Sequence, residues 1–277
     1  MIGGLGAAVC WAVGTLSAAR ASRLIGPNRV VAWMMLVGLV VNAPLAFAVG
    51  VPGALHGTRI LWFAVSGTAN IVGLLLAYDA MRLGKVSIVA PITSTEGAIA
   101  AVLAVIDGES LHASSAVLLG VIAAGVVLAS RTAEEGRAEH PLRATLLAVA
   151  AALSFGIGLF ATGHLSGELP VPWAMFPPRV VGAAVITGPA LARRRFSIPR
   201  AVLPFVVVAG LCEIGGFASY VAGARHSIAV AAVLASQFAA IAAVLAFVLF
   251  RERLTRVQAT GVAVVVVGVA VLSALQA

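Results

Sequence analysis

The sequence predicts an all-α integral membrane protein with ten transmembrane helices, arranged as two inverted five-helix repeats. Three observations support this fold class: the composition, the number of long apolar stretches, and a sequence repeat between the two halves. Hydrophobic residues make up 61% of the 277 residues and charged residues only 10%, whereas ordinary globular domains carry about 25% charged residues. This composition excludes an ordinary soluble protein and indicates that lipid surrounds most of the chain.

Ten apolar stretches of 18 to 23 residues follow one another along the chain. Each is long enough to cross a hydrocarbon core of ~30 Å as a helix that rises ~1.5 Å per residue. The first stretch also resembles a signal peptide, but it lacks a basic leading segment, so we keep it as a helix. The predicted helices cover residues 1–19, 30–50, 60–81, 86–106, 113–130, 144–162, 173–192, 201–223, 228–250 and 257–275.

The two halves of the chain share a sequence repeat. The segment AIAAVLAV at residues 98–105 returns 142 positions later as AIAAVLAF at residues 240–247. A repeat of this length is too long for a solenoid unit and fits a duplicated bundle of transmembrane helices, as in many secondary transporters. Further pairs align at nearly the same offset: Ser94 with Ser236, Asn70 with Glu213, Gly73 with Gly216, and Trp11 with Phe155.

The basic residues predict the orientation of these helices. Fifteen of the 18 Lys and Arg residues lie in loops that follow odd-numbered stretches, and only Arg59, Arg179 and Arg225 lie on the other side. Because Lys and Arg are enriched on the cytoplasmic side, we expect the odd-numbered loops to be cytoplasmic and both termini to lie outside. The net charge of +8 therefore reflects membrane topology, and we expect no nucleic-acid partner.

An odd number of helices in each repeat forces the second copy to enter the membrane upside down. The basic loops agree, because they follow the first and third helices of the first copy but the second and fourth helices of the second copy. The pattern predicts an inverted-topology repeat with its twofold axis in the membrane plane. We assign residues 1–130 to the first five-helix repeat, 131–143 to a cytoplasmic linker, and 144–277 to the second five-helix repeat.

Motifs in both halves resemble EamA-type members of the drug/metabolite transporter superfamily. They comprise Trp11, Arg29 and residues 87–96 in the first half, and Arg225, His226, Glu252, Arg253, Leu254, Thr255, Gln258, Gly261 and Gly268 in the second. The resemblance covers nearly the whole chain and implies a multi-pass secondary transporter in the inner (plasma) membrane of a bacterium. Because family members move amino acids, sugars, nucleotide sugars and other metabolites, it favours export of a metabolite or amino acid, with uptake as the alternative.

Polar groups inside the apolar stretches are the candidates for function. An ionised carboxylate at the bilayer centre costs about 2.5–3.5 kcal/mol on insertion scales, so it is expected to face a cavity or a partner. Two carboxylates lie near the midpoints of the fourth and eighth stretches, and the repeat brings their counterparts to the same depth, where inverted repeats place their substrate site. The predicted substrate and coupling residues are Glu96, Glu213, Asn70, Gln237 and Thr95, with Trp11 and Phe155 as walls of the site.

A structural role is the alternative for each of these residues. Either glutamate can instead fix helix packing, and the two amides can instead form hydrogen bonds between helices. The nearest cations, Arg82, Arg179 and Arg225, are predicted at the membrane edges, so we expect neither glutamate to have a cationic partner. At least one of them is then expected to hold a proton when no substrate is bound. Outside the stretches, Glu109 and His112 are interpreted as a local pair within one loop.

An enzyme and a channel are the rival classes. An intramembrane aspartyl protease needs two facing aspartates, and Tyr78 with Asp79 matches one motif while no second one exists. The sequence also lacks a His-Glu-x-x-His metal site, a Gly-x-Ser-x-Gly elbow and a phosphate-binding loop, so we predict no catalytic residue, metal or cofactor. An oligomeric channel is kept as an alternative, although midplane carboxylates in an inverted repeat favour alternating access. The expected partners are a small-molecule substrate, the bilayer and, as one option, protons, for a monomer or a homodimer.

Overall fold

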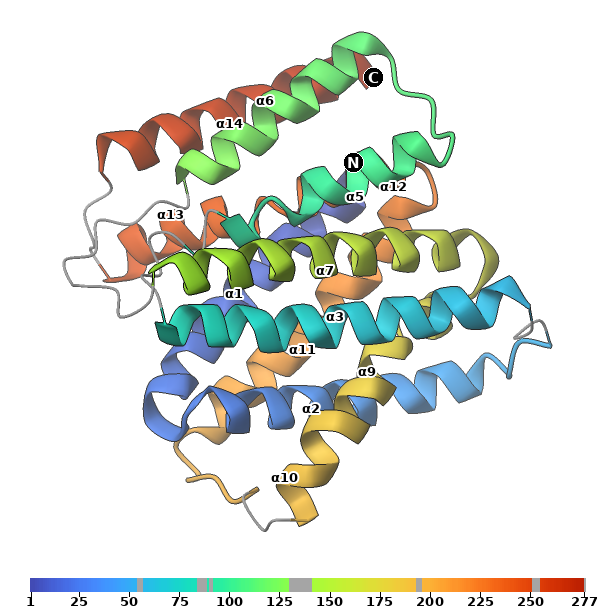
Figure 1. Cartoon of the computed structure of the whole chain (residues 1–277), viewed down its shortest axis with the longest axis vertical. Coiled ribbons are helices and arrows are strands. Elements are labelled where there is room, and N and C mark those ends of the chain that lie inside the picture. The colour runs from blue at the N-terminus through green and yellow to red at the C-terminus, as the bar shows by residue number, and fades with distance from the viewer. Residues whose placement is uncertain are drawn as a thin grey trace.

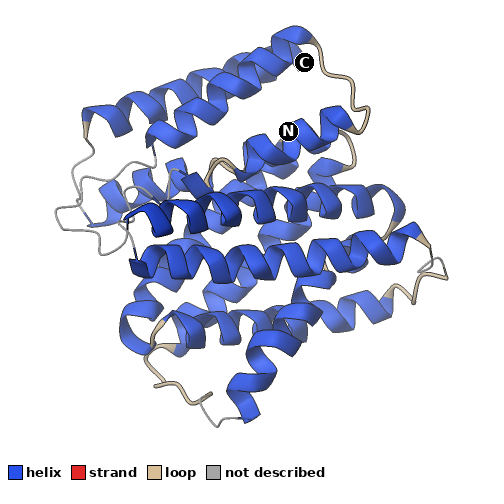
Figure 2. Cartoon of the chain, in the orientation of Figure 1, coloured by secondary structure: helices blue, strands red, loops and turns tan. Residues whose placement is uncertain are grey.

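The computed structural model describes residues 1–53, 57–83, 89, 92–129, 141–192, 196–250 and 255–276, and every regular element in this part is a helix (Figure 2). A helix lies within each of the ten predicted stretches, which confirms the all-α fold class. The helices are α1 (Ile2–Ile25), α2 (Pro27–Ala48), α3 (Thr58–Leu83), α5 (Glu96–Ile106), α6 (Ala113–Ala129), α7 (Pro141–Glu168), α8 (Val171–Ala174), α9 (Pro177–Gly182), the π-helical η1 (Ala183–Thr187), α10 (Gly188–Ala192), α11 (Leu203–Ala224), α12 (Ile228–Ala235), α13 (Phe238–Phe250) and α14 (Arg256–Gln276). Among the described residues, five helices are long and apolar enough to cross a membrane, by length and composition: α1, α2, α3, α7 and α11.

The fourth and ninth predicted helices are each interrupted near the middle. A turn at residues 236–237 separates α12 from α13, and α5 begins directly after the equivalent turn at residues 94–95. Polar side chains favour both turns, because they hydrogen-bond to the backbone in place of a continuous helical ladder. Thr95 Oγ1 donates to the carbonyl three residues earlier (2.7 Å) and Gln237 Nε2 to the carbonyl four residues earlier (3.1 Å). The prediction of one uninterrupted apolar helix at 228–250 is therefore wrong, as it is at 86–106 in the part that the structure describes.

The seventh predicted helix is a series of short pieces, from α8 to α10. Prolines stand at the first positions of α8 and α9, where their missing N–H costs nothing, whereas inside one long helix it would break the ladder. The following η1 segment is a π-helical turn, a local widening that is frequent at functional sites. Thr187 at its end donates a hydrogen bond to the Ala32 carbonyl (2.9 Å) and so ties this irregular segment to α2.

Helices of the two halves pack against each other in equivalent pairs. The most extensive helix contacts are those of α1 with α11 and of α3 with α7, and these two pairs are equivalent under the sequence repeat. Each pair has an aromatic ring seated on a glycine, and a Cβ added at Gly216 would lie 2.3 Å from Trp11 Nε1, while one added at Gly73 would lie 2.7 Å from Phe155 Cδ1. The duplicated sequence therefore produces duplicated packing. The α5–α12 and α6–α14 pairs also join the two halves.

The connections that follow α2, α5, α7 and α11 lie on one side of the molecule, which we call the even-loop face (right side of Figure 1). The N-terminus and the end of α14 also lie toward this side (Figure 1). The assignment of this face to the outside stays a prediction. Much of the charge behind that assignment belongs to residues 130–140, 193–195 and 251–254, which lie outside the described residues together with most of the predicted linker.

Candidate functional site

Glu213 in the middle of α11 forms an ion pair with Arg179 of α9. The Arg179 Nη2 atom lies 3.4 Å from Glu213 Oε1, and the arginine side chain is fully buried while that of Glu213 is 21% exposed. The expectation that neither glutamate has a cationic partner is therefore wrong for Glu213. Arg179 does not lie at a membrane edge, because α9 carries its side chain into the core between α2 and α11.

Two helices, α2 and α11, hold the Arg179 side chain in place. On α2, Gly38 leaves room for the arginine stem, since an added Cβ would lie 2.9 Å from Arg179 Cδ, and Met35 Sδ lies 3.8 Å from Nη1. On α11, the Phe217 ring lies 4.9 Å below the guanidinium carbon, a cation–π contact that is strongest when both groups are desolvated. The Nε atom has no hydrogen-bond partner among the described residues, so Arg179 is held largely by Glu213 and the aromatic ring.

Sequence reasoning missed Arg179, although the repeat contained a signal for it. The segment PPRVV at residues 177–181 matches PNRVV at residues 27–31, so Arg179 is the counterpart of Arg29. Arg29 is exposed near the start of α2, as charge counting expects. In the second copy the extra helical piece α8 precedes the motif, so the same arginine enters the core instead of the membrane edge.

Glu96 lies at the first position of α5, at the interruption of the fourth helix. The residue is 8% exposed and makes no hydrogen bond or ion pair to any described residue, yet it is close enough to Glu213 to experience its charge. The next residue, Gly97, packs against α12, because an added Cβ would lie 2.4 Å from the Ala232 carbonyl and 2.7 Å from Ser236 Oγ. Glu96 therefore stands where α5 crosses the interrupted ninth helix.

The two polar residues at the interruptions are buried to different degrees. Gln237 is 1% exposed, and its Oε1 atom has no partner within the described part of the chain. Thr95 is half-buried and uses its hydroxyl on the backbone, as described above. Gln237 thus keeps one unused acceptor in the core, while Thr95 shapes the turn that precedes Glu96.

Trp11 connects the second interruption to the ion pair. Its ring meets Phe217 edge-on at 5.3 Å and Phe238 edge-on at 6.4 Å, and Phe217 is the ring that carries Arg179. The Trp11 Nε1 atom is buried without a partner among the described residues. Glu96, Glu213, Gln237 and Trp11 therefore belong to one central region, to which the structure adds Arg179.

Asn70 and Phe155 lie on the other equivalent interface, between α3 and α7. Phe155 packs on Gly73, and Gly158 of α7 faces the Asn70 backbone, where an added Cβ would lie 3.2 Å from the amide nitrogen. Both residues are half-buried. In the described residues, no hydrogen bond or ion pair joins either of them to the Arg179–Glu213 pair.

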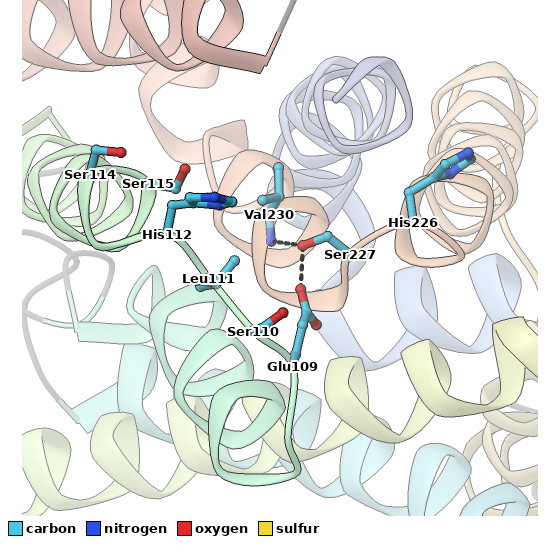
Figure 3. Close-up of a pocket in the computed structure, with 9 residues that line it drawn as sticks. All are labelled: Glu109, Ser110, Leu111, His112, Ser114, Ser115, His226, Ser227 and Val230. Atoms are coloured by element: carbon cyan, nitrogen blue, oxygen red, sulfur yellow. Dashed lines mark hydrogen bonds between the residues drawn. The ribbon is translucent and has the colours of Figure 1, made fainter.

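A second polar region lies on the even-loop face. A pocket of about 550 Å³ is lined by residues of the α5–α6 and α11–α12 connections and of the first turns of α6 and α12: Glu109, Ser110, Leu111, His112, Ser114, Ser115, His226, Ser227 and Val230 (Figure 3). The interpretation of Glu109 and His112 as a local pair is wrong, because the Glu109 carboxylate instead accepts hydrogen bonds from residues at the start of α12.

The sequence model of the EamA-like transporter family matches residues 1–131 and again residues 142–274. The chain belongs to this family. The two matches place the interrupted helices, the ion pair and the glycine-seated aromatic rings within an EamA fold that occurs twice in the chain. As a member, the protein is a multi-pass membrane transporter of the drug/metabolite superfamily.

Solved structures share the fold. A chain described as "Crystal structure of protein" aligns with a TM-score of 0.78 over 99% of this chain and 96% of its own, at 19% sequence identity. At this identity the likeness shows the fold alone. No curated protein matches the sequence, so the substrate of this EamA protein has to be inferred from its own residues.

Proposed function

We propose that this EamA protein is a secondary transporter that moves a small organic solute by alternating access, with Glu96 as the coupling residue. The observation that carries the proposal is a buried carboxylate without a described partner, placed where the interrupted fourth and ninth helices cross. Transporters with inverted repeats bind substrate at such discontinuous helices between the two halves. The packing of α5 on α12 makes this crossing a contact between the halves.

The charges of the central region support a solute with a positively charged group. Arg179 balances Glu213, so the charge left over is that of Glu96. An ionised carboxylate buried without a partner is costly, so Glu96 is neutral with a proton or ionised beside a cationic group of the solute. One proton and one cation then compete for the same carboxylate, which couples solute movement to a proton gradient.

We propose that buried polar atoms without a hydrogen-bond partner among the described residues make further contacts with the solute. Trp11 Nε1 offers a donor and Gln237 Oε1 an acceptor, and we propose that both face the solute when it is bound. Asn70 and Phe155 are proposed as the equivalent wall from the α3–α7 side, and Thr95 as the residue that shapes the turn before Glu96. Within the family, export of a metabolite or amino acid across a bacterial inner membrane is the favoured direction.

The test of this function starts with a solute that binds. Purified protein is screened for thermal stabilisation by amino acids, sugars and cationic drugs, because a ligand that binds the folded state raises its apparent stability. Transport of the stabilising solute is then measured in proteoliposomes with and without a pH gradient. In the Glu96→Gln variant we expect solute exchange to continue, while accumulation no longer depends on the pH gradient.

A matched control is Glu168→Gln, which removes a carboxylate from a largely exposed ion pair with Arg59. This variant is expected to transport like the unmodified protein. If Glu96→Gln folded normally and kept the full dependence on the pH gradient, Glu96 would have a packing role and the proposed coupling would be wrong.

A further inference from the structure

Glu109 joins the first half of the chain to the start of an interrupted helix in the second half. Its carboxylate follows α5 and accepts hydrogen bonds from the Ser227 hydroxyl, from Ile228 N (3.0 Å) and from Ala229 N (3.3 Å). Figure 3 shows Ser227 between Glu109 and the backbone nitrogen of Val230, to which its hydroxyl is also bonded at 3.0 Å. A carboxylate at this position satisfies free N–H groups and complements the positive end of the helix dipole.

The Glu109 contact closes one end of an antiparallel helix pair. At the other end, Gly97 of α5 lies against Ala232 of α12 and against Ser236, which directly follows α12. α5 therefore runs from the crossing to the even-loop face, and α12 returns from that face to the crossing. The pair spans the part of the protein between Glu96 and the even-loop face, and it is fastened at both ends by contacts between the two halves.

The space around this pair is filled with apolar side chains. All residues from Ala229 to Ala235 are buried, and they belong to one cluster with Ala100 and Ala104 of α5, Leu165 of α7 and Val221 of α11. Ser236, at the inner end of this pair, is 1% exposed, and in the part of the chain that the structure describes these buried apolar residues lie between it and the even-loop face. The polar pocket of Figure 3 stops at the start of α12.

We propose that the α5–α12 pair is the gate on the even-loop face and that Glu109 is its latch, the residue that holds the two outer ends together. The structure is then the state closed on this face. The inference rests on the proposed alternating access, because a transporter of that kind must open each face in turn. Opening here requires α12 to separate from α5, and within the described residues the hydrogen bonds of Glu109 hold their outer ends together. Glu109 therefore acts on the conformational equilibrium and not on the solute.

The test measures whether Ser236 becomes reachable from the even-loop face. In a background with Cys10→Ala and Cys212→Ala, Ser236→Cys is labelled by a charged thiol reagent in proteoliposomes, without any solute. The reagent is added on the side from which Ser110→Cys, a residue of the pocket, is labelled. With Glu109 intact we expect slow labelling. Glu109→Ala is expected to raise the rate at least about tenfold, which corresponds to about 1.4 kcal/mol in the closing equilibrium.

Two weaker variants keep the test decisive if Glu109→Ala does not fold. Glu109→Gln retains one acceptor oxygen, and Ser227→Ala removes one of the three donors, so both are expected to raise the labelling rate by a smaller factor. Ser110→Ala is the control, since it changes the same pocket but makes no hydrogen bond to another described residue. Unchanged labelling in all Glu109 and Ser227 variants would overturn the latch.

The labelling result for Ser236→Cys does not depend on whether a transported solute is found. If the variants open the even-loop face but no solute moves in any assay, the latch stands and the proposed function fails. If transport is found but labelling of Ser236→Cys does not respond to Glu109, the proposed function stands and the latch is wrong.

Discussion

Replacing Glu213 with Gln is expected to destabilise the protein, because the change leaves the Arg179 guanidinium charged, buried and without its counter-ion. The arginine side chain is fully buried, and its other guanidinium contacts among the described residues are the Phe217 ring at 4.9 Å and Met35 Sδ at 3.8 Å. Removing one partner of a buried ion pair costs about 3–5 kcal/mol. The lower end applies here, since Glu213 is 21% exposed and the N–O distance is 3.4 Å.

A double-mutant cycle separates the ion pair from other effects of the substitution. The Arg179→Met and Glu213→Gln variants and their combination are unfolded in mixed micelles, and the free energy of unfolding is compared with that of the unmodified protein. We expect Glu213→Gln to cost about 3 kcal/mol. The double variant is expected to be more stable than the sum of the single changes by about 1–2 kcal/mol, because contacting residues are not additive.

The surface pair between Arg59 and Glu168 provides the comparison. Glu168→Gln is expected to cost less than about 1 kcal/mol, since exposed pairs contribute little. Additivity of the Arg179 and Glu213 changes within about 0.5 kcal/mol would refute the view that the two side chains form a coupled buried pair.

Two further predictions concern packing and topology. Gly216→Ala is expected to cost about 1–3 kcal/mol of stability by overpacking, because the new Cβ would lie 2.3 Å from Trp11 Nε1. Gly120→Ala is the control and should be tolerated, because its new Cβ meets no described heavy atom within 4 Å. Thermal unfolding of both variants measures the difference. Cysteines placed at positions 134 and 194 are expected to resist an impermeant thiol reagent added to intact cells, and labelling at both positions would show that the predicted orientation is inverted.

Hydropathy and the repeat were enough to predict the fold class. Hydropathy gives the helices long enough to cross a bilayer, and the repeat shows that they form two copies. Ten stretches of sufficient length and one duplicated segment are enough to predict ten helices in two copies, and the helices lie where these signals predict. Continuity of a helix depends on a different kind of information. At Gln237 a single side chain that donates to the Val233 carbonyl accompanies a turn, and hydropathy averaged over about 20 residues does not detect such a bond.

The ion pair illustrates a second limit of sequence reasoning. Charge counting assigns an arginine near the end of an apolar stretch to the membrane edge, and this holds for Arg29, which is exposed. Arg179 occupies the equivalent motif, but α8 precedes it and Gly38 makes room for its stem. These are tertiary features from distant parts of the chain. The sequence therefore singled out the two carboxylates of the central region but did not predict that an arginine pairs with one of them, and the role of these residues stays a prediction.

A symmetric scaffold with asymmetric charges is what a single-site transporter requires. The packing of α1 on α11 repeats that of α7 on α3, so under the proposed alternating access the two halves exchange conformations between two states of similar packing. The ion pair does not repeat, because Glu213 corresponds to Asn70 and the counterpart of Arg179, Arg29, is exposed. In the proposed mechanism, the duplicated helices provide the two states, and the central region with Glu96, Glu213 and Arg179 is the one site that both states share.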